Sequence, residues 1–260
     1  MAFLPSDLAS LLLHLDAGSI TGKSDGDDVD SWTDQSTTGA SLTAAIGHEA
    51  IYRSAAVNSL PAVEFDGSTS RLTTSTAYPS DVANLGLVAV TKLDTNKNYN
   101  GFFVFDSASP ATDYLKISFW ADSSGNAYFY TSAGYLTITG GLTAGWQIVT
   151  YVLGQNTMFN RYDGIAVTQA TNPPPGTWAD NLKPTIGHVG LSNSFLDGRI
   201  AELVVFEETV LSESLYVEGY LSDKYSISLQ ADHPFSASPP SAAPSLGGMM
   251  RSGMSGGFFG

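Results

Sequence analysis

Short apolar stretches, alternating or continuous and closed by glycine, asparagine, aspartate or serine, recur along most of the chain. Alternation with a period of two is typical of a half-buried strand, and a short continuous apolar run between turn residues is typical of a strand buried on both faces. The pattern predicts strands at residues 11–15, 61–65, 85–92, 101–105, 115–120, 127–131, 135–139, 146–153, 158–162, 165–169, 185–187 and 200–206. The stretch 135–139 is short and is expected at a sheet edge.

A helical pattern is convincing at one place, residues 212–224. Leu211, Leu215 and Leu221 supply its apolar side. Ser212 can cap the first turn, and Glu213 follows where the helix dipole favours a carboxylate. Residues 5–7, Pro-Ser-Asp, predict one further short helical turn near the start of the chain.

The segments between these elements are polar and predict loops and turns. Residues 18–35 form an acidic loop that contains Trp32, and residues 196–199 predict a tight turn. Many antiparallel strands with one late helix indicate an all-β fold. We therefore expect a two-sheet antiparallel β-sandwich of the jelly-roll type, with one helix on the C-terminal side and an extended tail.

Charge and cysteine content narrow the classes of function. The net charge is −14, which repels phosphate backbones and anionic lipid, so we expect neither nucleic-acid nor membrane binding. The absence of cysteine excludes disulfides, thiolate zinc sites and thiol catalysis. The apolar run 11–13 lacks a positive flank, and Asp7, His14 and Asp16 interrupt it, so no signal peptide is expected.

Composition changes after Asp232 and predicts two parts, a jelly-roll domain at 1–231 and a tail at 232–260. The tail is rich in proline, glycine and serine, as linkers are. It also carries apolar anchors, which linkers rarely do and which docking peptides use. The predicted partner-docking residues are Met249, Met250, Met254, Phe258 and Phe259.

Four pieces of the chain resemble, in order, the concanavalin A-like or laminin G-like jelly-roll superfamily, whose laminin G-like domains occur in phage and bacterial surface proteins. They are the opening strand 11–17 with residues 20–22 and 32–36, the stretch 61–67 (PAVEFDG), the pair 145–152 with 162–164, and the closing segment 195–206 with 217–221. The match covers residues 8–229. The resemblance implies the fold but no one function, since the superfamily holds lectins, glycosidases, adhesion modules and inert spacers.

Catalysis is not expected. Glycoside hydrolysis needs two facing carboxylates, and the superfamily's glucan-cleaving members carry a Glu-x-Asp-x-(x)-Glu strand. Glu64 and Asp66 match its first half, but residues 67–69 are Gly-Ser-Thr and the second glutamate is absent. Asp66 is interpreted instead as a turn cap with Gly67. The histidines lack a nucleophile-elbow pattern, and His14 is interpreted as a satisfied core or interface residue.

Calcium is the metal that the sequence suggests, although no cofactor is required. Asp25, Asp27, Asp28 and Asp30 place four carboxylates in one loop, and calcium prefers oxygen ligands. The spacing does not match the helix–loop–helix calcium loop. The alternative is a solvated acidic loop.

Glycan binding is the second candidate chemistry, because sugars stack on aromatic rings while polar groups fix their hydroxyls. Trp178 follows a stiff proline run, with Asp180 and Asn181 as hydrogen-bonding partners. Tyr128 and Tyr130 share one strand face. The alternative is that these rings fill the core of the sandwich.

These features together favour a non-enzymatic virion structural protein, a capsid decoration or tail-associated appendage. It would be made in the host cytoplasm and displayed on the virion surface. Its tail would bind other virion or assembly proteins, its jelly roll would face solvent and touch cell-surface glycans, and it would form a homo-oligomer or multi-copy assembly. The alternative is a carbohydrate-binding or adhesion module of a bacterial surface protein, located outside the cell or on its surface.

Overall fold

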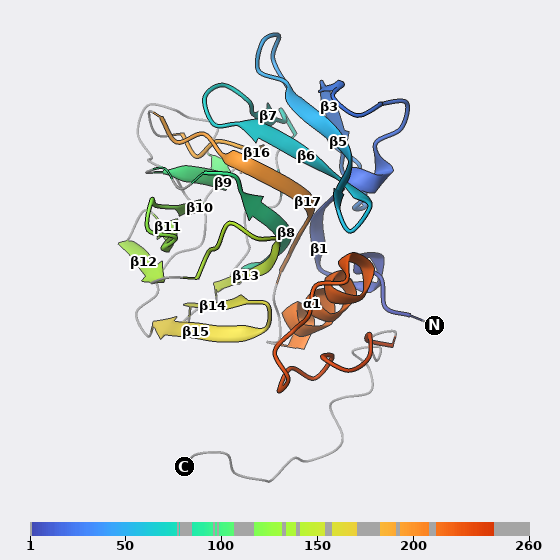
Figure 1. The fold of residues 1–260 in the computed structure, drawn as a ribbon, viewed down its shortest axis with the longest axis vertical. Helices are drawn as coiled ribbons and strands as arrows, with labels where there is room; N and C mark the ends of the chain where they lie inside the picture. Colours follow the sequence, from blue (N-terminus) through green and yellow to red (C-terminus); the bar gives the residue numbers. More distant parts are fainter. Residues whose placement is uncertain are drawn as a thin grey trace.

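The computed structural model describes residues 2–76, 78, 85–95, 97, 99–106, 117–131, 134–138, 141–153, 158–170, 183–190, 193–207 and 212–241. These residues form two antiparallel β-sheets packed face to face, with one α-helix on the outside of the first sheet (Figure 1). The predicted all-β sandwich is confirmed.

The first sheet has nine strands in the order β15-β14-β13-β8-β17-β6-β5-β2, with β1 also paired to β17. Its strands are β1 (Leu11–Asp16), β2 (Asp28–Val29), β5 (Ala50–Val57), β6 (Leu60–Asp66), β8 (Leu85–Leu93), β13 (Gln147–Leu153), β14 (Met158–Tyr162), β15 (Ile165–Ala170) and β17 (Asp197–Phe206). All of the pairings are antiparallel.

The second sheet has eight strands in the order β12-β11-β10-β9-β16-β7-β4-β3. Its strands are β3 (Ser31–Thr33), β4 (Ser41–Thr43), β7 (Leu72–Thr73), β9 (Asn100–Asp106), β10 (Ile117–Ala121), β11 (Ala127–Thr131), β12 (Gly134–Ile138) and β16 (Lys183–Ile186). The position of β12 at the end of this order confirms its prediction as an edge strand.

The main core lies between the sheets, and a second apolar cluster lies between the first sheet and the helix. Strand β8 contributes to both, with Leu85, Leu87 and Ala89 facing the main core and Val88 and Val90 facing the outer cluster. A strand covered on both faces is apolar along most of its length. The continuous apolar run in the sequence of β8 is therefore a direct consequence of the three-layer arrangement.

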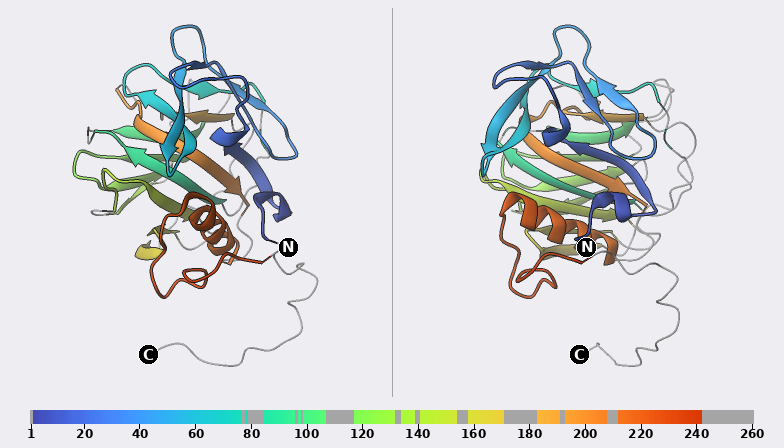
Figure 2. Two further views of the ribbon diagram at one scale, coloured as in Figure 1. Left: turned by 45° about the vertical axis from the view of Figure 1, so that its right-hand side comes forward. Right: turned by 90° about the vertical axis from the view of Figure 1, so that its right-hand side faces the viewer.

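Helix α1 (Ser212–Tyr225) packs on β8 and β13 at the end of the molecule opposite the β4–β5 loop (Figure 2). Its buried apolar side chains include Val217, Leu221 and Tyr225, which recur every four residues and so share one face. Two short 3₁₀ turns, η1 (Pro5–Asp7) and η2 (Ala17–Ser19), flank β1. Among the described residues, no helix is both long enough and apolar enough to cross a bilayer.

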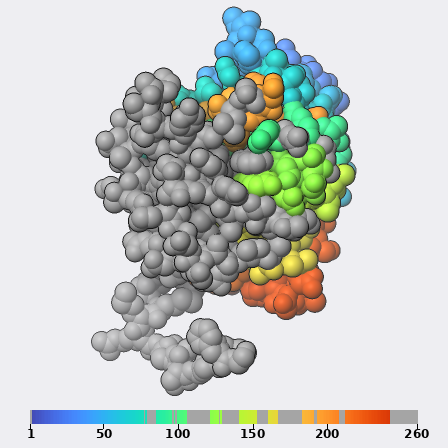
Figure 3. Space-filling model, turned by 90° about the vertical axis from the view of Figure 1, so that its left-hand side faces the viewer, coloured from blue at the N-terminus to red at the C-terminus, as the bar shows by residue number. Residues whose placement is uncertain are grey.

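Chain segments from the two ends of the described region meet beside α1. Phe3 donates its backbone N–H to the carbonyl of Pro240 at 3.1 Å, and Ala2 forms an antiparallel bridge with Ser241. Figure 3 shows the molecule from another side, again with the helix end of the fold at the bottom and the loop before β5 at the top. The segment 226–241 is therefore part of the folded body.

Two sequence predictions are wrong in detail. The predicted loop 18–35 contains strands β2 and β3, with Trp32 fully buried. Such strands have two or three residues and are too short to show a period. The predicted turn 196–199 lies mostly within β17, where a Cβ on Gly198 would meet the Lys92 carbonyl oxygen at 2.3 Å. This glycine marks a close approach of strands, not a turn.

Strands β4, β5 and β7 were not predicted. In β5, the consecutive residues Ser54 and Ala55 are both exposed, and neither is strongly apolar. The sequence therefore shows no alternation there. A two-residue turn follows at Asn58 and Ser59, both with positive φ, as a tight hairpin requires.

Candidate functional site

The candidate site is built at the C-terminal end of helix α1. Ser226 has a φ of 52°, and Ile227 donates its N–H to the Ser222 carbonyl at 3.2 Å. This geometry is the usual way of ending a helix with one left-handed residue. Asn58, from the β5–β6 turn, donates its Nδ2–H to the Tyr225 carbonyl at 2.5 Å. This carbonyl is one of those that a helix end leaves without an intrahelical partner.

The chain then returns along the outer side of the helix. Gly219 makes this possible, because a Cβ there would lie 2.7 Å from the Cβ of Phe235. The Phe235 ring packs on Tyr216 with their centroids 4.9 Å apart. His233 orders the turn before it, since its carbonyl accepts from Ser236 N–H at 3.0 Å and its Nδ1 accepts from Phe235 N–H at 3.2 Å.

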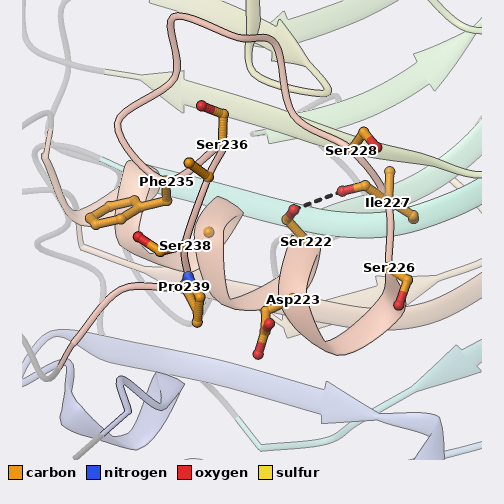
Figure 4. A pocket seen from close by; sticks show the side chains of 11 residues that line it. Ser222, Asp223, Ser226, Ile227, Ser228, Phe235, Ser236, Ser238 and Pro239 are labelled. Atoms are coloured by element: carbon orange, nitrogen blue, oxygen red, sulfur yellow. Dashed lines mark hydrogen bonds between the residues drawn. The ribbon is translucent and has the colours of Figure 1, made fainter.

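A pocket of about 320 Å³ lies between the helix and this returning segment. Figure 4 shows Ser226, Ile227 and Ser228 on one side, Phe235, Ser236, Ser238 and Pro239 on the other, and Ser222 and Asp223 of the helix between them. Gly219 and Ala237 complete the lining. The pocket thus combines five serine hydroxyls, one carboxylate and one aromatic ring.

Some of these polar groups are engaged within the protein. Ser222 donates its hydroxyl to the Ile227 carbonyl at 2.7 Å, and Ser236 donates to Ala231 at 3.1 Å. In the part of the chain that the structure describes, three other hydroxyls and a carboxylate of the lining have no hydrogen-bond or ion-pair partner. They belong to Ser226, Ser228, Ser238 and Asp223, all of which are exposed. These groups can therefore bind a polar ligand.

The opposite face of the helix carries charges that are fully paired. Glu218 is 0% exposed and receives Arg161 Nε at 2.5 Å and His233 Nε2 at 2.9 Å. Arg161 also donates to Ser214 Oγ at 2.7 Å. Because Glu218 bonds to both β14 and His233, it connects the sheet, the helix and the turn that precedes the pocket.

A second network lies under the last turn of the helix. Glu202 of β17, also 0% exposed, bonds to His14 Nε2 at 2.8 Å, Lys224 Nζ at 2.6 Å and Tyr225 Oη at 2.9 Å. Burial alone would raise the pKa of Glu202, but the hydrogen bond from His14 and the charge of Lys224 outweigh it and hold this pKa below its usual value. His14 is thus an internally satisfied residue, as the sequence predicted.

The predicted glycan-binding residues lie away from this pocket or outside the described residues. Trp178, Asp180 and Asn181 are outside the described residues. Tyr128 is half-buried in β11 and donates its hydroxyl to Asp122 at 2.9 Å. Tyr130 lies in the same strand, and its side chain is not among those described.

The predicted docking anchors of the tail, Met249, Met250, Met254, Phe258 and Phe259, also lie outside the described residues. Of the predicted tail, residues 232–241 are described, and there His233 and Phe235 pack against helix α1. The domain boundary at Asp232 stays a prediction.

Three of the four aspartates of the predicted calcium loop are held by other partners. Asp25 accepts from Ser54 N–H at 2.9 Å, Asp27 from Ser24 N–H at 2.6 Å, and Asp30 pairs with Lys23 at 3.0 Å. Asp28 is exposed in β2. Within the described ranges, no group of three or more acidic or histidine side chains is placed to hold a metal ion. Calcium binding stays a prediction.

The acidic residues considered for hydrolysis are engaged in structure. Glu64 pairs with Arg53 at 2.7 Å and with Arg199 at 2.7 Å. Asp66 accepts the backbone N–H groups of Ser68, Thr69 and Ser70, which confirms its interpretation as a turn cap.

No protein-family model matches the chain, and no curated protein matches it in sequence. Its fold is shared with solved structures. The sialidase of Trypanosoma rangeli, in its covalent 2,3-difluorosialic acid intermediate, matches with a TM-score of 0.60 and 15% identity over 84% of this chain and 33% of the sialidase. The same sialidase with sialic acid matches with a TM-score of 0.59 and 14% identity over the same shares.

A further match is the binding domain of Paraclostridial Mosquitocidal Protein 1, with a TM-score of 0.56 and 12% identity over 84% of this chain and 53% of that domain. The chain therefore spans about a third of the sialidases and about half of this binding domain. At these identities the likeness shows the fold alone, a β-sandwich of antiparallel sheets.

One functional expectation has to be corrected. The sequence favours a protein without enzymatic activity, but the solved structures that share the fold include sialidases, which are enzymes. The missing Glu-x-Asp-x-(x)-Glu strand excludes one catalytic pattern, and it does not exclude an enzyme.

Sequence reasoning missed the pocket. Its residues 235–239 (FSASP) read as linker because serine and proline dominate them. A signal was present in the lone Phe235 among small residues and in Gly219 inside a helix, where glycine is disfavoured. Glycine there indicates that another chain segment approaches closely.

Proposed function

We propose that this chain is a carbohydrate-binding module, with its binding site in the pocket between helix α1 and residues 226–239. The observation that carries the proposal is the lining of that pocket, which includes one aromatic residue, three unengaged hydroxyls and a carboxylate. Sugars are bound by stacking on aromatic rings and by hydrogen bonds from a few placed polar groups. A volume of about 320 Å³ is at the small end for ligand pockets.

The comparisons support the proposal without extending to the ligand. Two of the matching structures are sialidases described with sialic acid or its difluoro derivative, and a third is a binding domain. Among β-sandwich folds, we assign the chain to the laminin G-like group as part of the same proposal.

A glycan array with the full chain tests the proposal, followed by calorimetry on the best ligand. We expect Phe235→Ala to weaken binding at least about tenfold, because a sugar loses its stacking surface, and Ser228→Ala and Ser238→Ala to weaken it less. Ser31→Ala, an exposed serine of β3 in the other sheet, is the matched control. Thermal unfolding checks that each variant is folded.

Two outcomes would contradict the proposal. One is an array on which no glycan is bound. The other is a bound glycan whose affinity is unchanged by Phe235→Ala and both serine variants, which would place the site elsewhere.

The virion structural role expected from the sequence rests on the tail and on location, and it stays a prediction. Deletion of residues 242–260 is the appropriate test, because residues 232–241 belong to the folded body. The predicted assembly partners, multi-copy state and virion location are tested by the same deletion in a particle-incorporation assay.

A further inference from the structure

The charges around the pocket have one sign. Asp223 is the one charged residue in the lining, and the lining contains no lysine, arginine or histidine. Its carboxylate is exposed and has no ion-pair partner among the described residues. A ligand that enters the pocket therefore meets an uncompensated negative charge.

The cations closest along the chain are committed elsewhere. Lys224, the next residue, bonds to Asp16 at 2.7 Å and to Glu202 at 2.6 Å on the other side of the helix. Arg161 and His233 are both bonded to Glu218. Moving any of them toward the pocket would take a partner from a fully buried carboxylate, which is unfavourable. Asp223 is thus not neutralised by its surroundings.

Recognition of an acidic sugar needs the opposite arrangement. A carboxylate ligand is bound best by arginine, through paired charge-assisted hydrogen bonds, or by lysine. A negative charge in a binding site repels a carboxylate on the ligand and so lowers the affinity for an acidic ligand. The net charge of −14 adds a long-range repulsion of the same sign.

The lining also limits the size of the ligand. Phe235 is the one aromatic ring in the lining, so it offers one stacking surface, and the volume of about 320 Å³ is small for a ligand site. These features favour a single terminal sugar residue over a long segment of a chain.

We infer that the pocket binds a terminal sugar that lacks a carboxylate, and that Asp223 excludes sialic and uronic acids. The inference rests on the proposed carbohydrate-binding function and specifies its ligand class. It separates this chain from the sialidases that share its fold, whose matching structures hold sialic acid or its derivative.

Matched pairs of ligands test the inference: glucose with glucuronic acid, galactose with galacturonic acid, and one glycan with and without its terminal sialic acid. We expect the carboxylate-free member of the bound pair to have at least about tenfold higher affinity at low salt. The preference should shrink in 1 M salt, where the screening length is about 3 Å.

The variant Asp223→Asn keeps the shape of the side chain and removes its charge. We expect the ratio of affinities within the pair to fall at least about threefold, mainly because the acidic member gains. Asp232→Asn is the matched control, since Asp232 is exposed in the same region but does not line the pocket, and it should leave the ratio unchanged.

The outcomes separate the two levels of the argument. Equal or tighter binding of the acidic member, or a ratio that Asp223→Asn leaves unchanged, overturns the ligand class and leaves the proposed function standing. Binding of no member of any pair, together with an empty array, overturns the proposed function and this inference with it.

Discussion

Polar groups are buried and paired on the inner face of helix α1 but exposed on its outer face. On the inner face, Glu218 and the neighbouring Glu202 of β17 are fully buried, and each has a histidine and a cationic partner. On the outer face, Asp223 and the serines around it are exposed, and several have no partner among the described residues. The comparison teaches that polarity alone does not mark a binding site; what distinguishes the outer face is that its polar groups remain available.

The largest expected effect is on the inner face. Glu218→Ala should lower the free energy of unfolding by about 3–5 kcal/mol, because it leaves Arg161 buried without its carboxylate. Asp223→Ala, the matched acidic residue of the outer face, should change it by less than about 0.5 kcal/mol. Urea denaturation of both variants measures the difference. Similar values for the two variants would show that the charge pairing of Glu218 contributes little to stability.

The next effect concerns the contact between helix α1 and the segment that returns along it. In an ordinary helix interior, replacing glycine by alanine stabilises by about 1 kcal/mol. Gly219→Ala should instead destabilise by about 1–3 kcal/mol, because the new Cβ would lie 2.7 Å from that of Phe235. Denaturation gives the sign, and binding of the array ligand should fall with it as Phe235 moves. A stabilised variant would contradict the close approach.

A smaller effect is expected from acid on the Glu202 network. The pKa of Glu202 is lowered in the folded state, so its contribution to stability is complete above the usual value of 4.5 and is lost as the pH falls through the folded pKa. Glu202→Gln should therefore be clearly less stable than the wild type at pH 7. The difference should narrow as the pH falls below 4.5 and through the lowered folded pKa of Glu202, where the wild-type side chain takes up a proton.

Denaturation of both proteins at several pH values isolates this residue from other carboxylates, because those titrate equally in the two. A stability difference that stays constant across the range would show that the charge of Glu202 contributes little.

The sandwich could be predicted from the sequence because burial on both faces makes β8 and β17 largely apolar, β17 being interrupted by Glu202. Helix α1 could be predicted because its residues follow helical spacing. The short strands β2, β3, β4 and β7 could not, since two or three residues carry no period.

The candidate site was beyond sequence reasoning for a different reason. Arg161 and Glu218 are 57 residues apart, and their pairing depends on the order of strands in the sheet. Residues 235–239 look like a linker until Gly219 and Tyr216 are seen to face Phe235. The signal lies in tertiary contact, which composition does not reveal.

The pairing of Ala2 with Ser241 has a consequence for how this domain can be combined with others. Because of this pairing, the two ends of the described body lie side by side. Such a unit can be inserted into a surface loop of a host protein, or circularly permuted, with a short connection across the gap. Its single point of attachment adjoins helix α1, so a host would be joined close to the pocket and could extend, cover or orient it.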